Sequence, residues 1–154
     1  MNPSRTNRVI LMADDDVDDR LLVREALAEA AVPHHLLFAE DGQMLLDYLK
    51  GTGSYANQPD APRPELILLD LNMPLKDGRE VLREIRSDAV LRRIPVVVFT
   101  TSRADTDIHQ MYELGANSFV TKPAAFADLV RLMKRLTEYW FDTVHLPEPM
   151  GHKA

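Results

Sequence analysis

Acidic, hydroxyl and amine side chains follow four short apolar runs of this sequence, and their types suit one kind of chemistry. They are Asp14 and Asp15, Asp70, Thr100, and Lys122. Carboxylates gathered in one place repel each other, since two unit charges about 4 Å apart interact by about 4 kcal/mol at an effective dielectric constant of about 20. Mg²⁺ prefers oxygen ligands and typically binds one or two carboxylates together with a phosphate. The set therefore suits a divalent metal ion and a phosphoryl group, with Lys122 as a further positive charge.

Asp70 is the best candidate nucleophile of the set, because a carboxylate can form an aspartyl phosphate. Asp14 and Asp15 would then hold the metal ion. Phosphoryl transfer depends mostly on positioning and on neutralising the equatorial oxygens of the phosphoryl group. That work would be shared by Mg²⁺, Lys122, the Thr100 hydroxyl and nearby backbone N–H groups.

The apolar runs predict the strands of a parallel sheet, over residues 8–13, 34–39, 65–69, 94–99 and 118–121. Residues at helical spacing predict helices over 17–32, 41–51, 105–114 and 126–139, and another that begins at Gly78. Strands that alternate with helices indicate a doubly wound α/β domain with right-handed crossovers. Ligands of such sheets bind outside the carboxyl ends of the strands, so we expect the polar residues above to converge on one crevice.

Several other acidic residues are interpreted as helix caps. Asp16 should cap the first helix, with Asp18 and Asp19 in its first turn, where negative charge suits the helix dipole. Asp41 should cap the second helix. These carboxylates are therefore interpreted as helix caps and solvated charges of the first helical turn.

Composition narrows the class of protein. The chain has 154 residues, of which 45% are hydrophobic and 27% charged, as in an ordinary soluble domain. Its formal net charge is −6, so negatively charged partners such as a nucleic acid or an anionic membrane are not expected. It has no cysteine, which excludes disulfides, thiolate metal sites and cysteine nucleophiles. No apolar stretch is long enough for a signal-peptide core or a membrane span, and we expect a cytoplasmic protein.

Four segments, LMADDD, LLDLNMPLKDG, VVVFTTS and FVTKPA, resemble in sequence and order the signature segments of the CheY-like response-regulator receiver family. The resemblance extends from about residue 8 to 139. It implies a flavodoxin-like receiver fold, a five-stranded parallel sheet in strand order 2-1-3-4-5. It also implies that Asp70 is the phosphoacceptor and that Asp14, Asp15 and the Asn72 backbone carbonyl complete a Mg²⁺ site, which Mn²⁺ could also occupy.

The same resemblance assigns the remaining site residues. Lys122 would contact the phosphoryl group, and Thr100 and Phe119 would form the switch pair. The family's aromatic switch residue is commonly Tyr, so Phe119 would act through packing alone. On phosphorylation Thr100 would move inward, Phe119 would turn in, and the face around the fourth helix would change. The family usually has a cis peptide before the proline that follows this lysine, so a cis bond is expected between Lys122 and Pro123.

The segment YWFDTVHLPEP and the long loop over 52–64 resemble features of single-domain regulators that pair with phytochrome-type histidine kinases. We therefore expect a receiver domain over 1–140 and a C-terminal extension over 141–154, with no separate output domain. The protein would be a response regulator of a two-component phosphorelay, with a sensor histidine kinase and a histidine phosphotransfer protein as candidate partners. Trp140 and Phe141 either fold back on their own domain or contribute to the interface of an expected homodimer.

Three other functions compete with this interpretation. A dinucleotide-binding enzyme needs a glycine-rich turn after the first strand, where this chain has three aspartates. A phosphohydrolase of the haloacid-dehalogenase type places a second Asp two residues after its nucleophile, where this chain has Asn72, so no outside substrate and no enzyme activity of that kind is expected. A phosphate-independent adapter usually lacks the acidic pair, the phosphoacceptor or the lysine, and this chain has them all.

Overall fold

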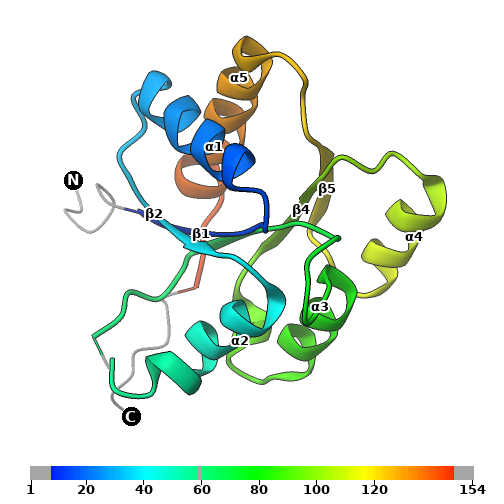
Figure 1. The fold of residues 1–154 in the computed structure, drawn as a ribbon. Coiled ribbons are helices and arrows are strands. Elements are labelled where there is room, and N and C mark those ends of the chain that lie inside the picture. Colours follow the sequence, from blue (N-terminus) through cyan, green and yellow to red (C-terminus); the bar gives the residue numbers. More distant parts are fainter. Residues whose placement is uncertain (1–7, 59, 148–154) are drawn as a thin grey trace.

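The computed structural model describes residues 8–58 and 60–147, which form one parallel sheet between two layers of helices (Figure 1). The strands are β1 (Arg8–Ala13), β2 (His34–Ala39), β3 (Leu66–Leu69), β4 (Val96–Thr100) and β5 (Ser118–Thr121). All four neighbouring pairs are parallel, and the order across the sheet is β2-β1-β3-β4-β5. The predicted fold class and strand order are confirmed.

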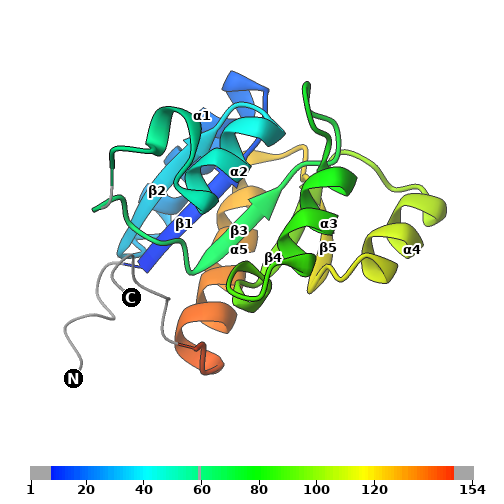
Figure 2. The same ribbon diagram turned by 90° about the horizontal axis from the view of Figure 1, so that it is seen from below.

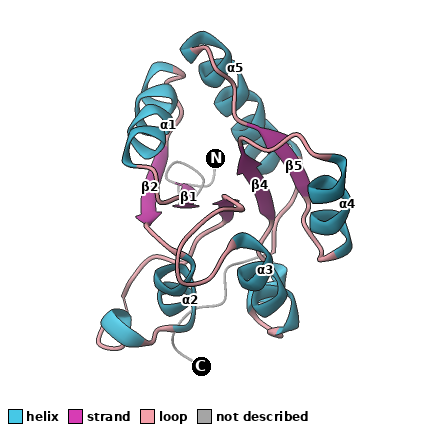
Figure 3. Ribbon diagram, turned by 45° about the vertical axis from the view of Figure 1, so that its right-hand side comes forward, coloured by secondary structure: helices cyan, strands magenta, loops and turns pink. Residues whose placement is uncertain are grey.

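The helices alternate with the strands along the chain. They are α1 (Val17–Glu29), α2 (Gly42–Lys50), α3 (Gly78–Ser87), α4 (Asp105–Glu113) and α5 (Phe126–Thr137), with short turns η2 (Gly53–Tyr55), η3 (Leu91–Arg93) and η4 (Glu138–Thr143). Helices α1 and α5 lie on one face of the sheet, and α2 and α3 on the other (Figures 2 and 3). None of the helices in the described ranges is long and apolar enough to cross a membrane.

Strand alternation divides the core into two layers. Ile10 and Met12 of β1 pack towards α1 and α5, whereas Leu11 and Ala13 pack towards α2 and α3. Successive side chains of a strand point to opposite faces, so each apolar run feeds both layers. Burial of the central strands on both faces explains why they are almost continuously apolar.

Local chemistry sets most element boundaries. Asp16 accepts hydrogen bonds from the backbone N–H groups of Asp18 and Asp19, and Asp41 accepts one from Met44, so both predicted caps are confirmed. Helix α1 ends before the predicted residue 32, because Ala31 adopts a φ of 56° that the helix cannot continue.

The start of strand β4 and the end of helix α5 each differ from the prediction by two residues. Strand β4 begins at Val96, after Pro95, because proline has no backbone N–H to donate to a neighbouring strand. Helix α5 ends at Thr137, whose hydroxyl donates to the Met133 carbonyl at 2.8 Å, and the chain continues as the wider turn η4.

The aromatic residues of η4 fold back on their own domain to different extents. Phe141 is buried in the α1/α5 layer, and the Arg8 guanidinium lies 5.7 Å from the centre of its ring. Trp140 is half-buried and meets the exposed Tyr139 edge-on, with 5.0 Å between the ring centres. Part of the predicted extension, residues 148–154, lies outside the described residues.

Candidate metal and phosphoryl site

Three carboxylates meet at the carboxyl end of the sheet, as the sequence predicts. Asp14 follows β1 and Asp70 follows β3, and the backbone N–H of Asp70 donates to the Ala13 carbonyl at 3.0 Å, which brings the two chain positions side by side. One oxygen each from Asp14, Asp15 and Asp70 lies within 4.8 Å of the others. Asp14 and Asp70 are buried and Asp15 is exposed, so the cluster opens to solvent on the Asp15 side.

This donor set fits a divalent cation of the Mg²⁺ type. Carboxylate oxygens are its preferred ligands, and the open side leaves room for the waters and phosphate oxygens that Mg²⁺ retains. Buried carboxylates with too little positive charge around them are costly, so a cation would relieve the cluster. Asp14, Asp15 and Asp70 can hold such an ion.

Lys122 reaches into this cluster from the segment after β5. Its Nζ donates to Asp14 Oδ2 at 2.7 Å, to Asp19 Oδ2 at 2.7 Å and to Asp70 Oδ2 at 3.3 Å. Its backbone N–H donates to the Thr100 carbonyl at 2.7 Å, which fixes the start of the side chain at the end of β4. The structure therefore brings Lys122 and the three carboxylates together.

The pKa values of the cluster reflect burial and pairing. Burial raises the pKa of Asp14, and its hydrogen bonds from Lys122 and from the Asp16 backbone oppose that rise. Burial acts to lower the pKa of Lys122, but hydrogen bonds to Asp14 and Asp19 and the charge of Asp70 outweigh it and raise this pKa. Lys122 is thus a permanent cation at physiological pH.

The Thr100 hydroxyl is fully buried and has no hydrogen-bond partner. In the described part of the chain, Thr100 Oγ1 and Arg8 Nε are the buried side-chain polar atoms without one. A buried unsatisfied hydroxyl costs about 1–3 kcal/mol, so its persistence needs an explanation. Thr100 ends β4, which pairs with β3, the strand that Asp70 follows, so this donor is suited to an oxygen of a bound anion.

Phe119 lies on the same face of the sheet as Thr100. Val98 pairs with Phe119 and Thr100 pairs with Thr121 across β4 and β5, so Thr100 and Phe119 are diagonal neighbours. Phe119 is half-buried against the α2/α3 layer, and its backbone N–H donates to the Tyr112 hydroxyl of α4 at 3.2 Å. The pair thus lies between the carboxylate cluster and α4, while its proposed movement stays a prediction.

The loop after β3 folds tightly against Asp70. The Gly78 backbone N–H donates to the Leu71 carbonyl at 2.8 Å, and a Cβ atom on Gly78 would lie 2.6 Å from the Asp70 carbonyl oxygen. Only glycine fits this approach. Asn72 is exposed in the same loop, two residues after Asp70, and its carbonyl as a metal ligand stays a prediction.

Two sequence-based expectations are wrong. Asp19 does more than suit the helix dipole, since it pairs directly with Lys122; the one signal for this was its place in the first turn after a strand that ends at the crevice. The bond between Lys122 and Pro123 is trans, as are all peptide bonds among the described residues. The trans form is intrinsically favoured by about 0.5–1 kcal/mol before proline, and the Lys122 amine reaches the cluster with it.

Proteins of similar sequence and structure agree with the fold and with the geometry of this site. The family model for the response regulator receiver domain matches residues 10–134. Response regulator Rcp1 from Synechocystis sp. is 43% identical over 144 residues, 94% of this chain and 96% of Rcp1. A solved structure of Rcp1 in a Mn²⁺-bound form covers 91% of this chain and 99% of that one, with a TM-score of 0.81.

Two further solved structures are similar over nearly their whole length. Phosphorylated RcpA, a cyanobacterial phytochrome response regulator, is 46% identical with a TM-score of 0.84, covering 92% of this chain and 99% of RcpA. RPA3017, a response regulator in red light signalling of R. palustris, is 38% identical with a TM-score of 0.85, covering 91% and 98%. The strand order of the sheet, the carboxylate cluster and the similar proteins all point to one family. The chain belongs to the response regulator receiver domain family.

Proposed function

We propose that Asp70 accepts a phosphoryl group from a histidine kinase while Asp14, Asp15, Asp70 and the Asn72 carbonyl hold Mg²⁺. One observation carries this proposal: an ammonium on a side chain that is only 9% exposed, Lys122 Nζ, lies 3.3 Å from an Asp70 oxygen within a cluster of carboxylates. The cation and the carboxylate are both needed at the site of an aspartyl phosphate.

In the reaction, an Asp70 carboxylate oxygen attacks the phosphorus of a phosphohistidine. The new O–P bond forms as the P–N bond breaks, and the electron pair goes to the imidazole nitrogen, which takes up a proton. Lys122 Nζ and the Thr100 hydroxyl bind the phosphoryl oxygens, which would give the Thr100 hydroxyl a partner. A divalent ion held by Asp14, Asp15 and Asp70 would supply positive charge to neutralise the same oxygens.

Phosphorylation raises the local negative charge to about −2 and adds acceptor oxygens, which would draw Thr100 inward and let Phe119 turn in. Because the Phe119 backbone N–H donates a hydrogen bond to the Tyr112 hydroxyl of α4, this movement would change the α4 face. A phosphate-independent adapter is the weaker proposal, since Asp14, Asp15, Asp70 and Lys122 are all present and assembled.

The kinase is proposed to be of the phytochrome type, because RcpA is a phytochrome response regulator and RPA3017 acts in red light signalling. Exposed apolar side chains of α1 and of the start of α5 offer it a docking surface at the Asp70 end of the sheet. They are Val17, Leu21 and Phe126, with 61%, 48% and 40% of their surfaces exposed. A histidine phosphotransfer protein could use the same surface, and neither a nucleic acid nor a membrane is proposed as a partner.

A homodimer is proposed at the edge of the sheet formed by β5. In the described part of the chain no further strand pairs with the outer side of β5, and a groove of about 430 Å³ lies beside it between Ser118, Leu132, Leu136, Tyr139 and Trp140. We place the receiver domain at 1–140 and the extension at 141–154, in the cytoplasm. Light scattering after size exclusion tests the dimer, and a strict monomer at micromolar concentration would refute it.

Intact-mass measurement tests the phosphoryl transfer. Wild-type protein incubated with acetyl phosphate and Mg²⁺ should gain one phosphoryl group, whereas the Asp70→Asn variant and a sample with chelator should gain none. Equal mass gain in the Asn variant, or no gain in the wild type with either acetyl phosphate or a cognate kinase, would overturn the proposal.

A further inference from the structure

Lys122 is held by a carboxylate that belongs to neither the proposed nucleophile nor the proposed metal ligands. The Lys122 side chain is only 9% exposed. Asp19 Oδ2 accepts a hydrogen bond from Lys122 Nζ at 2.7 Å, a distance as short as that between Lys122 Nζ and Asp14 Oδ2. The third contact, to Asp70, is longer at 3.3 Å. The ammonium is therefore fixed mainly by Asp14 and Asp19.

A bound divalent ion would divide these partners. Asp14 and Asp70 belong to the cluster whose oxygens lie within 4.8 Å of one another, and both would share their charge with the ion. Asp19 lies outside that cluster. It is thus the partner of Lys122 that stays free to bind the ammonium when the metal site is filled.

Asp19 is itself well anchored for this task. Its backbone N–H donates to Asp16 Oδ1 at 3.2 Å in the first turn of α1, where the helix dipole favours a negative charge. Lysine has a flexible four-carbon stem and three rotatable donors, so a single contact does not fix its ammonium group. Besides Asp19, the Phe99 ring lies 5.8 Å from Lys122 Nζ and lines the same side chain.

We propose that Asp19 is a positioning residue for phosphoryl transfer: it holds the Lys122 ammonium at the place where the phosphoryl oxygens reach Asp70. This inference rests on the function proposed above, with Asp70 as phosphoacceptor. Asp19 makes no contact with the reacting atoms in this scheme and acts through Lys122 alone.

The matched variants are Asp19→Ala and Asp18→Ala. Both remove one carboxylate from the first turn of α1, but Asp18 is exposed and Asp19 alone of the two pairs with Lys122. Rates of phosphorylation are measured across acetyl phosphate concentrations at saturating Mg²⁺. We expect Asp19→Ala to lower the maximal rate about tenfold, in line with the sensitivity of transfer to small misplacements, and Asp18→Ala to leave it unchanged. Asp19→Asn, which keeps an acceptor oxygen, should recover part of the loss.

A second readout needs neither metal nor donor. In Mg²⁺-free protein, the ¹⁵N-labelled Lys122 ammonium should exchange slowly in the wild type and in Asp18→Ala, and measurably faster in Asp19→Ala, where the 2.7 Å contact to Asp14 remains. If the wild type is phosphorylated on Asp70 and Asp19→Ala reacts equally fast, the inference is wrong while the proposed function stands. If the wild type accepts no phosphoryl group, the proposed function fails and the inference fails with it.

Discussion

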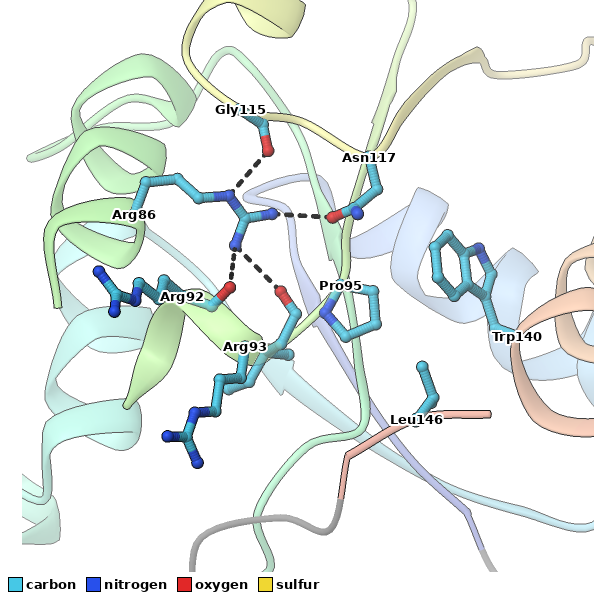
Figure 4. Close-up of a pocket in the computed structure, with 9 residues that line it drawn as sticks. Arg86, Arg92, Arg93, Pro95, Gly115, Asn117, Trp140 and Leu146 are labelled. Carbon is cyan, nitrogen blue, oxygen red and sulfur yellow. Dashed lines mark hydrogen bonds between the residues drawn. The ribbon is translucent and has the colours of Figure 1, made fainter. Parts of the chain in front are cut away.

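The two ends of the same sheet differ in how completely their charged side chains are paired. At the amino end, the Arg86 guanidinium donates to the carbonyl oxygens of Gly115, Arg92 and Ile94 and to Asn117 Oδ1, at 2.7 to 3.1 Å (Figure 4). At the carboxyl end, the carboxylates outnumber the one ammonium among them, and the Thr100 hydroxyl has no partner.

The paired groups at the amino end stabilise the fold, whereas the unpaired groups at the carboxyl end are suited to binding. Arg86 ties α3 to the turn before β4 and to the loop before β5, and Asn117 Oδ1 also accepts from the Val96 backbone at 2.8 Å. A cavity of about 300 Å³ beside it is also lined by Trp140 and Leu146, and none of its lining residues in the described part of the chain is acidic. The carboxyl end instead keeps uncompensated charge and an unpaired donor, which destabilise the fold unless a cation and an anion bind.

The largest effect is expected from Arg86→Ala. The substitution would remove the donor from the carbonyl oxygens of Gly115, Arg92 and Ile94, at about 1–3 kcal/mol for each one that no water reaches. We expect the free energy of unfolding to fall by about 3 kcal/mol in urea denaturation. Arg83→Ala, an exposed arginine of the same helix, is the control and should change it by less than about 0.5 kcal/mol. Equal effects of the two variants would end the contrast between the sheet ends.

A smaller and opposite effect is expected from Asp14→Asn. Because burial raises the pKa of Asp14, its ionised form is disfavoured in the folded state, so its contribution to stability is greatest below the unfolded pKa and is lost as pH rises through the folded one. Without metal at neutral pH, the free energy of unfolding of Asp14→Asn should exceed that of the wild type by about 1 kcal/mol. This is the size of one screened repulsion between two carboxylates.

Added Mg²⁺ should reverse that ranking, since the wild type would gain stability by binding the ion and the variant would gain little. Thermal unfolding with and without Mg²⁺ measures both effects. A metal-free variant that is less stable than the wild type would show that the carboxylates at this end are adequately paired.

The smallest effect concerns a carboxylate of the same end that is fully paired. The Ser102 hydroxyl and then Arg79 hold the pKa of Asp107 in α4 below its usual range. The stability that ionised Asp107 contributes is therefore present above its pKa in the unfolded chain, about 4. It is lost as the pH falls through the lower pKa of the folded state. Urea midpoints measured from neutral to acid pH should fall less steeply in Asp107→Asn than in the wild type. Parallel profiles would mean that this pairing adds no stability.

The sequence predicted the parts of the site that follow from strand ends. Asp14, Asp70, Thr100 and Lys122 each follow an apolar run, and parallel strands must bring such positions to one edge. Asp19 was not predicted as a site residue, because an acidic side chain in a first helical turn serves the helix dipole equally well. Its pairing depends on where a lysine from a distant segment reaches.

Other features depend on packing between distant segments and left no local pattern. Arg86 bonds to a carbonyl 29 residues away, and nothing in the helix that carries it marks that contact. The unpaired state of the Thr100 hydroxyl is likewise set by what surrounds it in space. Helix α5 was predicted to run two residues too far, because the side-chain bond of Thr137 competes with the regular helix.

Borohydride reduction followed by peptide sequencing locates the phosphoryl group on the chain. Protein treated with acetyl phosphate and Mg²⁺ is reduced with borohydride, which converts an aspartyl phosphate to homoserine, and the peptides are sequenced by mass spectrometry. If Asp70 is the phosphoacceptor, homoserine will appear at position 70 and unmodified aspartate at positions 14, 15 and 19. Homoserine at one of those three positions, with intact aspartate at position 70, would contradict it.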